Sequence, residues 1–351
     1  MSKPPTLQQI ADRAGVSKNT VSGALRNMPG YATATCERIL KLAEEMGYRA
    51  NPMVSALMRN MRQSQPVASQ GNLAYLHAYG NLQKWNSAPF SYYLFEGAKE
   101  RGSLLGFHVD PVWLTEPGMT GSRLTRVLRA RGVKGLIVSP LLRSRGRLHL
   151  DWDMFASVSL GFSLWRPVLH RVATHQYHVM SLVFRNLRHL GYERIGVLFS
   201  REMDSRFDFA WEAGLAVAAG IFGSMRLPPV VVTEQMGVAQ LKKWLDRHKP
   251  DVIVDGGLGL DRHLAKLGME MPHEIGYVSL LADGSPEGAA TVRPDWQALG
   301  AAALDVVAEQ LIHNERGIPA KPRTVLIEGE WMPGATVRDC RKRSVARNRS
   351  R

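Results

Sequence analysis

The sequence predicts a mixed α/β protein, with an N-terminal all-α head and a two-lobed core of parallel β-sheet. Two patterns lead to this fold class. Within residues 1–60, apolar residues recur at the three- and four-residue spacing of short amphipathic helices. From residue 72 onward, strand-like apolar runs alternate with amphipathic helical stretches, and a glycine repeatedly closes a helix just before the next strand, at Gly106, Gly132 and Gly191. Such βα repetition is typical of a parallel sheet with helices on both faces.

The head begins with two short helices joined by a tight turn. Thr6 and Gln9 have the spacing of a capping box, which predicts that the first helix starts there. Gly15 ends this helix, and Ser17 can cap the second one. The expected buried positions of the two helices are Leu7, Ile10, Ala11, Ala14, Val21, Ala24 and Leu25. Two helices in this order form a helix-turn-helix, whose second helix is free to enter a DNA major groove.

A third helix and a short fourth helix follow. The apolar stripe of the third helix consists of Ile39, Leu42, Ala43 and Met46. Asn51 and Pro52 have the pattern of an N-cap followed by a proline at the first helical position, which predicts a fourth helix to about Leu57. We therefore place the head at residues 1–50, and a hinge helix with a polar linker at 51–71.

The two-lobed core is expected over residues 72–337, followed by a basic, disordered tail at 338–351. The clearest strand-like runs are 73–78, 135–139, 195–199, 230–232, 251–255 and 276–280. Helices are expected near 91–105, 121–131, 176–190, 204–220, 238–248, 258–267 and 295–313. In folds of this kind ligands bind beyond the carboxyl ends of the strands, so we expect a ligand site between the lobes.

The composition is that of an intracellular protein with a substantial core. The chain has 351 residues, of which 45% are hydrophobic and 22% charged, so it is not a disordered chain. No apolar run reaches the roughly 18 residues of a membrane span, and the N-terminus lacks the apolar segment of a secretory signal. The two cysteines, Cys36 and Cys340, lie far apart, which excludes a disulfide scaffold and a cysteine-based zinc site. We expect a cytoplasmic protein without membrane partners.

The positive charge is concentrated at the two ends of the chain. Lys and Arg number 45 against 31 Asp and Glu, a net charge of +14. Residues 1–65 carry a net charge of +5 and residues 338–351 a net charge of +6, which leaves only +3 for the remainder. Basic ends suit a polyanion, because each Lys or Arg that meets a phosphate releases counterions. Arginine outnumbers lysine 33 to 12, which a high-GC genome could also produce, so charge alone leaves nucleic-acid binding open.

The amino-acid sequence of the head resembles a known family of proteins. The segment TLQQIADRAGVSKNTVSGALRN is followed by ERILKLAEEMGYRANPMVSALMR. Together they closely resemble the DNA-binding head of LacI/GalR-type bacterial repressors, and the matching words are Ile10-Ala11, Ala14-Gly15-Val16-Ser17, Thr20-Val21-Ser22, Glu37-Arg38-Ile39, Gly47-Tyr48 and Asn51. The βα core is more weakly similar to that family's effector-binding core, which resembles type I periplasmic binding proteins. The resemblance implies a sequence-specific DNA-binding transcriptional repressor that acts as a homodimer.

The resemblance also implies which side chains meet DNA. Lys18 and Asn19 stand at the start of the recognition helix, where lysine suits guanine O6 and N7 and asparagine suits adenine N6 and N7. The hydroxyls that can reach phosphates or base edges, or else only cap the helices, are those of Thr6, Ser17, Thr20 and Ser22. Gly23 stands where family members usually have a base-reading arginine, so the preferred operator should differ from the usual family sites.

The predicted fourth helix resembles the family's hinge helix. Asn51 matches in register, and Leu57 matches the leucine with which each hinge of the family wedges into the minor groove and kinks the duplex. An apolar wedge unstacks a base step, and the bend exposes more contact surface. The alternative is that Leu57 is an ordinary apolar helix residue.

The expected partners are a double-stranded DNA operator, a second copy of the chain and a small-molecule effector. Arg206 resembles the family's effector-binding arginine, within one residue of register. The other predicted effector-binding residues are Trp85, Trp165, Trp211 and Asp255. Where sugar-binding members have Asp or Asn after a strand, this chain has Gly161, Gly256 and Leu281. We therefore expect an aromatic-rich wall with few carboxylates, suited to a sugar or a related, less hydroxylated metabolite.

Two other classes of protein stay open as alternatives: an α/β enzyme, and a solute-binding protein, each with a fused DNA-binding head. The sequence contains no G-x-S-x-G, HExxH or Walker motif, so we predict no enzymatic activity and no cofactor. His175 and His178 are three residues apart at an expected helix start, a spacing that could hold a metal. No matching carboxylate is fixed by the spacing, and we predict no metal site.

Overall fold

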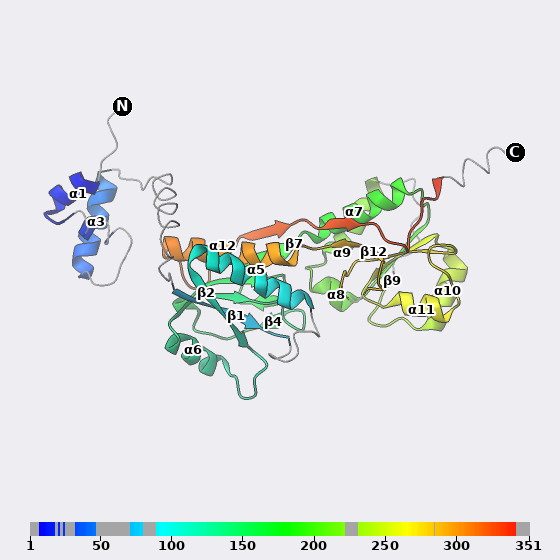
Figure 1. Cartoon of the computed structure of the whole chain (residues 1–351), viewed down its shortest axis with the longest axis horizontal. Coiled ribbons are helices and arrows are strands. Elements are labelled where there is room, and N and C mark those ends of the chain that lie inside the picture. The colour runs from blue at the N-terminus through cyan, green and yellow to red at the C-terminus, as the bar shows by residue number, and fades with distance from the viewer. Residues whose placement is uncertain are drawn as a thin grey trace, which may run out of the picture. The chain divides into compact units, whose positions relative to one another are not determined.

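The computed structural model describes residues 7–17, 20–21, 24, 32–46, 71–79, 89–221, 231–283 and 285–341. These residues belong to two compact units, Met1–Ala68 and Ser69–Arg351. The first unit holds the head, and the second holds the two-lobed core (Figure 1). Within the described ranges, no helix combines the length and hydropathy of a membrane span.

The described part of the head consists of α1 (Leu7–Ala14) and α3 (Thr33–Glu45), with helical residues Thr20, Val21 and Ala24 between them. The predicted apolar stripes converge on one small core, made of Ile10, Ala11, Ala14, Val21, Ala24, Cys36, Ile39 and Ala43. The expected packing of the three helices is therefore confirmed for the described residues. Cys36 is buried in this core as a free thiol.

The first lobe of the core is a six-stranded sheet in which every pair of neighbours is parallel. The strand order is β13-β7-β5-β3-β1-β2. The strands are β1 (Gly71–His77), β2 (Phe107–Trp113), β3 (Val133–Val138), β5 (Ala156–Leu160), β7 (His170–Thr174) and β13 (Thr324–Ile327). Two short strands, β4 (Gly146–Arg147) and β6 (Leu164–Arg166), form a separate pair, and a single 3-10 turn covers Trp152–Met154.

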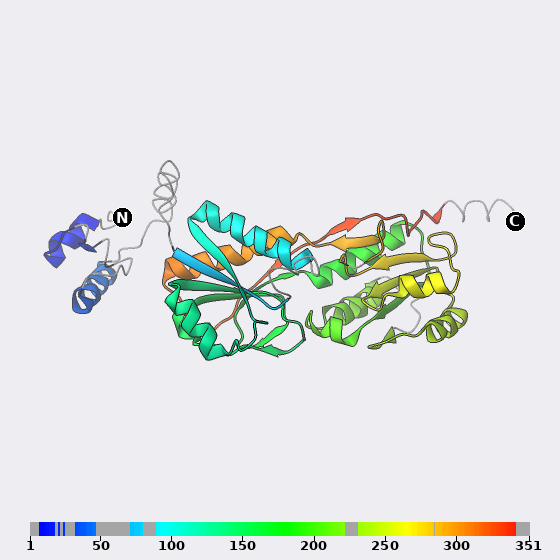
Figure 2. The same cartoon turned by 60° about the horizontal axis from the view of Figure 1, so that its bottom comes forward.

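The helices of the first lobe are α5 (Pro89–Leu105), α6 (Gly121–Ala130) and α12 (Trp296–His313). Figures 1 and 2 show α5 and α12 side by side on one face of the sheet and α6 on the other. A separate hydrophobic core fills each face, because the strands are buried on both sides. This is the two-sided arrangement that the βα repetition predicts.

The second lobe repeats this plan. Its sheet has the order β14-β12-β11-β10-β8-β9, and only the pair of β12 and β14 is antiparallel. The strands are β8 (Ile195–Phe199), β9 (Val231–Val232), β10 (Val252–Gly256), β11 (Gly276–Ser279), β12 (Ala290–Arg293) and β14 (Glu330–Met332). The helices are α7 (Gln176–His189), α8 (Arg201–Ser205), α9 (Ala210–Ile221), α10 (Val238–His248) and α11 (Leu260–Lys266). One core lies under α7 and α9, and the other lies under α10 and α11.

Within the described residues of the core, the chain crosses between the lobes three times. The first crossing is residue 175, between β7 and α7, and the second is residues 294–295, between β12 and α12. The third is residues 328–329, between β13 and β14. We call these three segments the hinge crossings. The predicted two-lobed parallel fold is thus confirmed, although the sequence did not locate the crossings.

One expected helix, 204–220, is wrong. The structure has two helices there, α8 and α9, joined by a turn in which Asp208 and Phe209 have left-handed φ angles of 58° and 60°. The buried carboxylate of Asp204 accepts a hydrogen bond from the backbone N–H of Trp211 (3.0 Å), and so takes part in starting α9. The helical spacing of apolar residues runs across this break, because both helices pack on the same side of the sheet.

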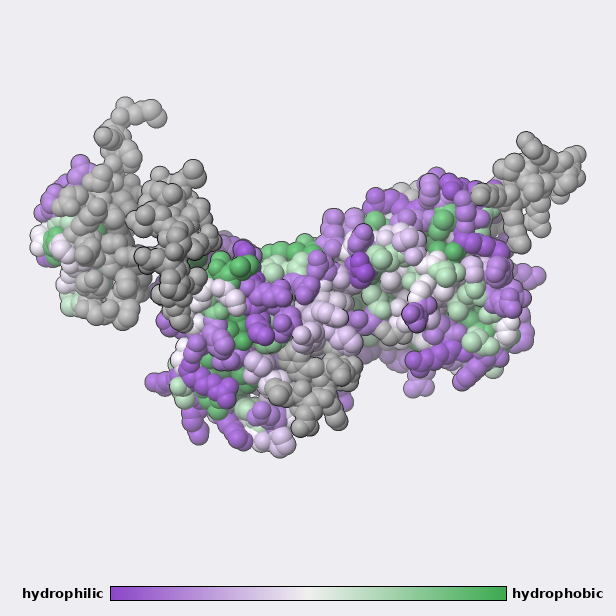
Figure 3. Space-filling model, in the orientation of Figure 1, coloured by the Kyte–Doolittle hydropathy of each residue, from purple (hydrophilic) through white to green (hydrophobic). Residues whose placement is uncertain are grey.

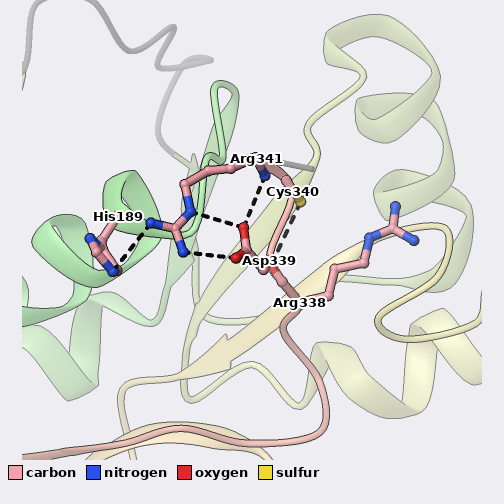
Figure 4. Close-up of polar contacts among 5 residues, drawn as sticks. All are labelled: His189, Arg338, Asp339, Cys340 and Arg341. Atoms are coloured by element: carbon pink, nitrogen blue, oxygen red, sulfur yellow. Dashed lines mark hydrogen bonds and ion pairs between the residues drawn. The ribbon is translucent and has the colours of Figure 1, made fainter. Parts of the chain in front are cut away.

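The last four described residues pack on the second lobe, although the sequence analysis assigned them to a disordered tail. The backbone N–H of Cys340 donates to the carbonyl of Leu190 (2.7 Å). The Arg341 guanidinium pairs with the Asp339 carboxylate (2.7 Å) and reaches the His189 ring (3.5 Å), as Figure 4 shows. The core therefore extends to at least Arg341.

The helices α5 and α12 cross at two glycines, where their backbones touch. A Cβ atom on Gly300 would overlap the carbonyl oxygen of Leu94, and one on Gly97 would overlap the carbonyl of Gln297. Both clashes are with backbone, so they cannot be relieved by rotating a side chain. The two closely packed helices cover the hydrophobic core on one face of the first-lobe sheet.

We predict that Gly300→Ala lowers the free energy of unfolding by about 1–3 kcal/mol, because overpacking forces the two helices apart. The matched control is Gly220→Ala on α9, where an added Cβ meets nothing within 4 Å. That substitution should stabilise the protein by up to about 1 kcal/mol through helix propensity. Urea unfolding of both variants checks this, and equal stabilities of the Gly300 variant and the parent would contradict it.

Candidate DNA-binding head and effector site

The turn between the first two helices of the head is closed by backbone hydrogen bonds. The N–H of Gly15 donates to the Asp12 carbonyl (3.4 Å), and the N–H of Val16 donates to the Ala11 carbonyl (3.1 Å). This pair of bonds is the Schellman pattern, and Gly15 has the φ angle of +64° that glycine adopts without strain. The turn therefore directs the chain from α1 into the second helix at a defined angle.

The predicted cap at Ser17 is present. Its Oγ accepts a hydrogen bond from the backbone N–H of Thr20 (3.1 Å), and the two hydroxyl oxygens are 2.8 Å apart. Both hydroxyls therefore take part in starting the second helix. Ser17 is exposed, and a hydroxyl oxygen can accept more than one hydrogen bond. Capping and phosphate contact are thus compatible, and the DNA contacts of Ser17 and Thr20 stay predictions.

Arg38 ties α3 to the end of α1. Its Nη2 donates to the carbonyl of Ala14 (3.1 Å), one of the last carbonyls of α1, which has no partner within its own helix. The fully buried Ile10, Val21 and Ile39 join the same three helices from inside. The described residues of the second helix are therefore held against both neighbouring helices.

Several predicted site residues lie outside the described part of the chain. They are Thr6, Lys18, Asn19, Ser22, Asn51, Leu57 and Trp85. The expected hinge helix and almost all of the linker at 51–71 lie outside it as well. The roles given to these residues remain predictions.

Arg206 lies at the boundary between the lobes and bridges it. The residue ends α8 in the second lobe, and its guanidinium donates to the carbonyl oxygens of Leu141 and Leu142, both at 2.9 Å, in the loop after β3 of the first lobe. It also donates to the hydroxyl of Tyr79, which follows β1. Hydrogen bonds from a charged donor are stronger than neutral ones. In this lobe arrangement, the predicted effector anchor holds the lobes together.

Glu202, one turn before Arg206, makes a second bridge. Its carboxylate accepts hydrogen bonds from the backbone N–H (3.0 Å) and the hydroxyl (3.1 Å) of Ser144 in the first lobe. The backbone N–H of Ser144 is the main reason why the pKa of Glu202 lies below its usual range, and partial burial opposes the shift. We call Glu202 and Arg206, with their first-lobe partners, the interlobe clamp.

Sequence reasoning missed Glu202, Ser144 and Tyr79. The available signal was local: Ser200 caps α8 through the N–H of Met203 (3.2 Å), and acidic residues fill the first turn of this helix. That pattern predicts where a helix starts but not what its side chains meet. Ser144 stands 58 positions from Glu202, so only the packing of the lobes brings the two together.

Trp211 does not line the lobe boundary as predicted. It has no exposed surface and packs among Phe199 and Phe207 in the core of the second lobe. Its Nε1 donates to the Gln176 side chain (2.8 Å), so its polar atom is satisfied internally. The indole stabilises the lobe, and it cannot stack on a ligand without local unfolding.

Asp255 is likewise committed to the protein interior. Its carboxylate accepts from the backbone N–H groups of Leu258 and Leu260 (both 2.8 Å) and from the hydroxyl of Tyr277 (3.0 Å). Burial is the main cause that raises the pKa of this carboxyl. The residue therefore shapes the glycine-rich loop before α11, and the predicted effector contact is not offered in this structure.

Trp165 is the predicted stacking residue that remains on the surface, with 41% of it exposed. It lies on β6, and the guanidinium groups of Arg147 and Arg166 lie 5.3 and 4.8 Å from its ring centre. Arg171 similarly lies 5.5 Å from the ring of Phe162. Arginines on β4, β6 and β7 thus lie over the aromatic rings of Trp165 and Phe162.

A surface hollow of about 620 Å³ lies elsewhere, at the C-terminal end of α12 in the first lobe. Its lining includes His170, Glu309 and Arg323, and none of the predicted effector residues borders it. Arg323 and Glu309 form a bidentate ion pair there, in which Nη1 and Nη2 of the arginine donate to Oε1 (3.0 Å) and Oε2 (3.1 Å) of the glutamate. The hollow is therefore not the predicted ligand site.

Comparison with known proteins gives a family match for the head and fold matches for nearly the whole chain. Residues 6–51 match the family described as "Bacterial regulatory proteins, lacI family". Over 53 residues the chain is 45% identical to the HTH-type transcriptional regulator GntR of Pseudomonas aeruginosa, an alignment that covers 15% of this chain and 16% of that protein.

The fold of nearly the full chain is similar to solved regulators. One is the transcriptional regulator CelR in complex with cellobiose, with a TM-score of 0.57 and 20% identity over 95% of this chain and 99% of that chain. Another is the lac repressor dimer bound to operator and the anti-inducer ONPF, with a TM-score of 0.52 and 17% identity over 96% and 100%. Residues 6–51 are thus similar to the lacI family, and the core has the fold of these regulators, which confirms the predicted resemblance and fold class.

We predict that Glu202→Gln loosens the interlobe clamp. The amide keeps the size of the side chain but loses the charge that strengthens both bonds to Ser144. The lowered pKa of Glu202 gives the sign of a pH effect: the bridge is present above the ordinary pKa of a glutamate and is lost as the pH falls through the lowered value. Acid should therefore open the parent protein and leave the variant unchanged.

Spin labels on Arg126→Cys and Lys243→Cys, one exposed site in each lobe, measure the distance between the lobes. The matched control is Glu212→Gln, because the ion pair of Glu212 with Arg201 (3.0 Å) lies within the second lobe. Equal distances in the Glu202 variant, the control variant and the parent at every pH would show that Glu202 does not hold the lobes.

Proposed function

We propose that this protein is a sequence-specific DNA-binding transcriptional regulator, acting as a cytoplasmic repressor whose operator affinity is set by a small molecule held between the two lobes. The observation that carries the proposal is the lacI-family match of residues 6–51, joined to the Schellman turn and the Ser17 cap that orient the second helix. The lac repressor, whose fold is similar, is described as a dimer bound to operator.

In this proposal Lys18 and Asn19 read base edges from the start of the second helix. Thr6, Ser17, Thr20 and Ser22 contact phosphates or base edges and set the register of the head on the duplex. Asn51 and Leu57 belong to the hinge helix, and Leu57 enters the minor groove as a wedge.

The proposal includes a homodimer, because one small head makes too few contacts with DNA for specific affinity. The first lobe offers apolar surface for such an interface. Its most exposed large apolar residues on α5 and α12 are Leu104 and Ile312, each 66% exposed, with Tyr92 and Tyr93 at 41% and 46%. Figure 3 shows hydrophobic residues on this side of the core, near α5 and α12. Two copies would place two heads on a pseudo-palindromic operator.

The effector is proposed to act on the interlobe clamp. Arg206 already binds two carbonyl oxygens and a hydroxyl, which are the groups that a sugar or a related metabolite would imitate. A ligand that takes over these bonds changes the relative free energies of two lobe arrangements. The similar regulator CelR is described in complex with cellobiose, which makes a sugar the first class to test.

We predict that binding-site selection with the full chain yields a pseudo-palindrome with half-sites about one helical turn apart. On that site, Leu57→Ala should weaken specific binding by at least about tenfold and leave binding to random DNA nearly unchanged, because the wedge acts only where the duplex can kink. Fluorescence anisotropy at several salt concentrations measures both affinities. Equal losses on operator and random DNA would show that Leu57 is not a wedge.

We further predict that Arg206→Ala abolishes the response to an effector found by screening sugars and sugar derivatives. The matched control is Glu202→Gln, which also loosens the clamp but keeps the guanidinium. Titration of operator complexes with effector should therefore show a response in the Glu202 variant and none in the Arg206 variant. An unchanged effector affinity in Arg206→Ala would place the ligand elsewhere.

A further inference from the structure

Two of the hinge crossings bring a pair of histidines and a glutamate together. His175 is the first crossing, His178 lies in the first turn of α7, and Glu328 begins the third crossing. The ligand atoms of the three side chains all lie within 4.8 Å of one another. The sequence showed the histidines, but Glu328 lies 150 positions after His178, so no spacing could reveal the carboxylate.

The geometry of this cluster is defined by its contacts. The Nε2 of His178 lies 3.8 Å from the Oε2 of Glu328. The rings of His175 and His178 face each other, with their centres 5.7 Å apart and their planes inclined by only 23°. The backbone N–H of His175 also donates to the carbonyl of Ile327 (2.8 Å), which ties the first crossing to the end of β13, next to Glu328. The ligands therefore stand on backbone that is held in place by a hydrogen bond.

We propose that His175, His178 and Glu328 bind a divalent transition metal, with zinc as the first candidate. Two imidazoles and one carboxylate form a donor set that zinc prefers, and that magnesium and calcium, which select oxygen, do not. Zinc ligation requires distances of about 2.0–2.2 Å from each ligand atom, and the three ligand atoms, within 4.8 Å of one another, are close enough to surround one ion. Both histidines are half-buried and Glu328 is exposed, so a metal can enter from solvent and complete its coordination with water.

A metal at this position would affect the movement of the lobes. It would cross-link the first and third hinge crossings, through which any movement of one lobe against the other must pass. Metal binding would therefore stiffen the hinge and raise the thermal stability of the core, because a ligand that binds only the folded state stabilises it. This inference rests on the cluster alone and does not depend on the proposed function in DNA binding.

The test is titration of the full chain with zinc chloride, in competition with a chromophoric chelator, and with magnesium chloride as a parallel arm. We expect one zinc site, no magnesium binding at the same concentrations, and a higher melting temperature with zinc. His178→Ala and Glu328→Gln should each weaken zinc binding by at least about tenfold, since even outer-shell changes cost that much at metal sites. Cobalt(II) in place of zinc should give ligand-field absorption that both variants lose.

The matched control is His108→Ala. His108 also faces a carboxylate, that of Asp110 at 3.0 Å, and the described residues supply no third ligand to this pair. Replacing His108 by alanine should leave the zinc affinity unchanged. Glu328→Gln keeps the size of the exposed side chain, so folding, checked by circular dichroism, should be preserved. Absence of zinc binding in the parent, or equal affinities in the parent and both site variants, would overturn the proposal.

Discussion

The threefold passage of the chain between the lobes is the constraint on which the core depends. Both sheets are essentially parallel, so the three crossings turn the loops after β3 and β8 toward one boundary, where Arg206 meets Leu141 and Leu142. The same crossings set His175 beside Glu328. A ligand at the boundary and a metal at the hinge would therefore act on the same degree of freedom, the position of one lobe relative to the other.

The contacts between the lobes are weaker than the hydrophobic cores within each lobe. Each lobe has its own hydrophobic cores on both faces of its sheet, so each can move as a rigid body. The clamp contacts described here are polar, and hydrogen bonds to charged groups contribute about 1.5–3 kcal/mol each. Allosteric coupling is typically about 1–3 kcal/mol, so one clamp bond is of the size that the proposed effector response would need. Disrupting a core would cost far more.

In the head, by contrast, most of the contacts that fix the helices join residues that lie close together in the sequence. Gly15 closes the turn, Ser17 starts the second helix, and Arg38 satisfies a carbonyl at the end of α1. These contacts fix the start of the second helix with few residues. If the head reads DNA as proposed, so small a unit gains by being presented in two copies, which connects the geometry of the head to the dimer proposed for the core.

The sequence alone determined the features that depend on residues a few positions apart. It identified the helical stripes of the head, the cap at Ser17, the repetition of strands and helices, and Arg206 as a residue facing the lobe boundary. Only the tertiary structure decided which side chains face inward and which meet across the lobes. Trp211 and Asp255 have the residue types of a ligand site, yet packing within the second lobe buries both. Glu328 completes its cluster only because the third crossing lies beside the first. The physical reason is range: capping and periodicity act within about four residues, whereas pairing between distant loops is fixed by sheet order and by the hinge.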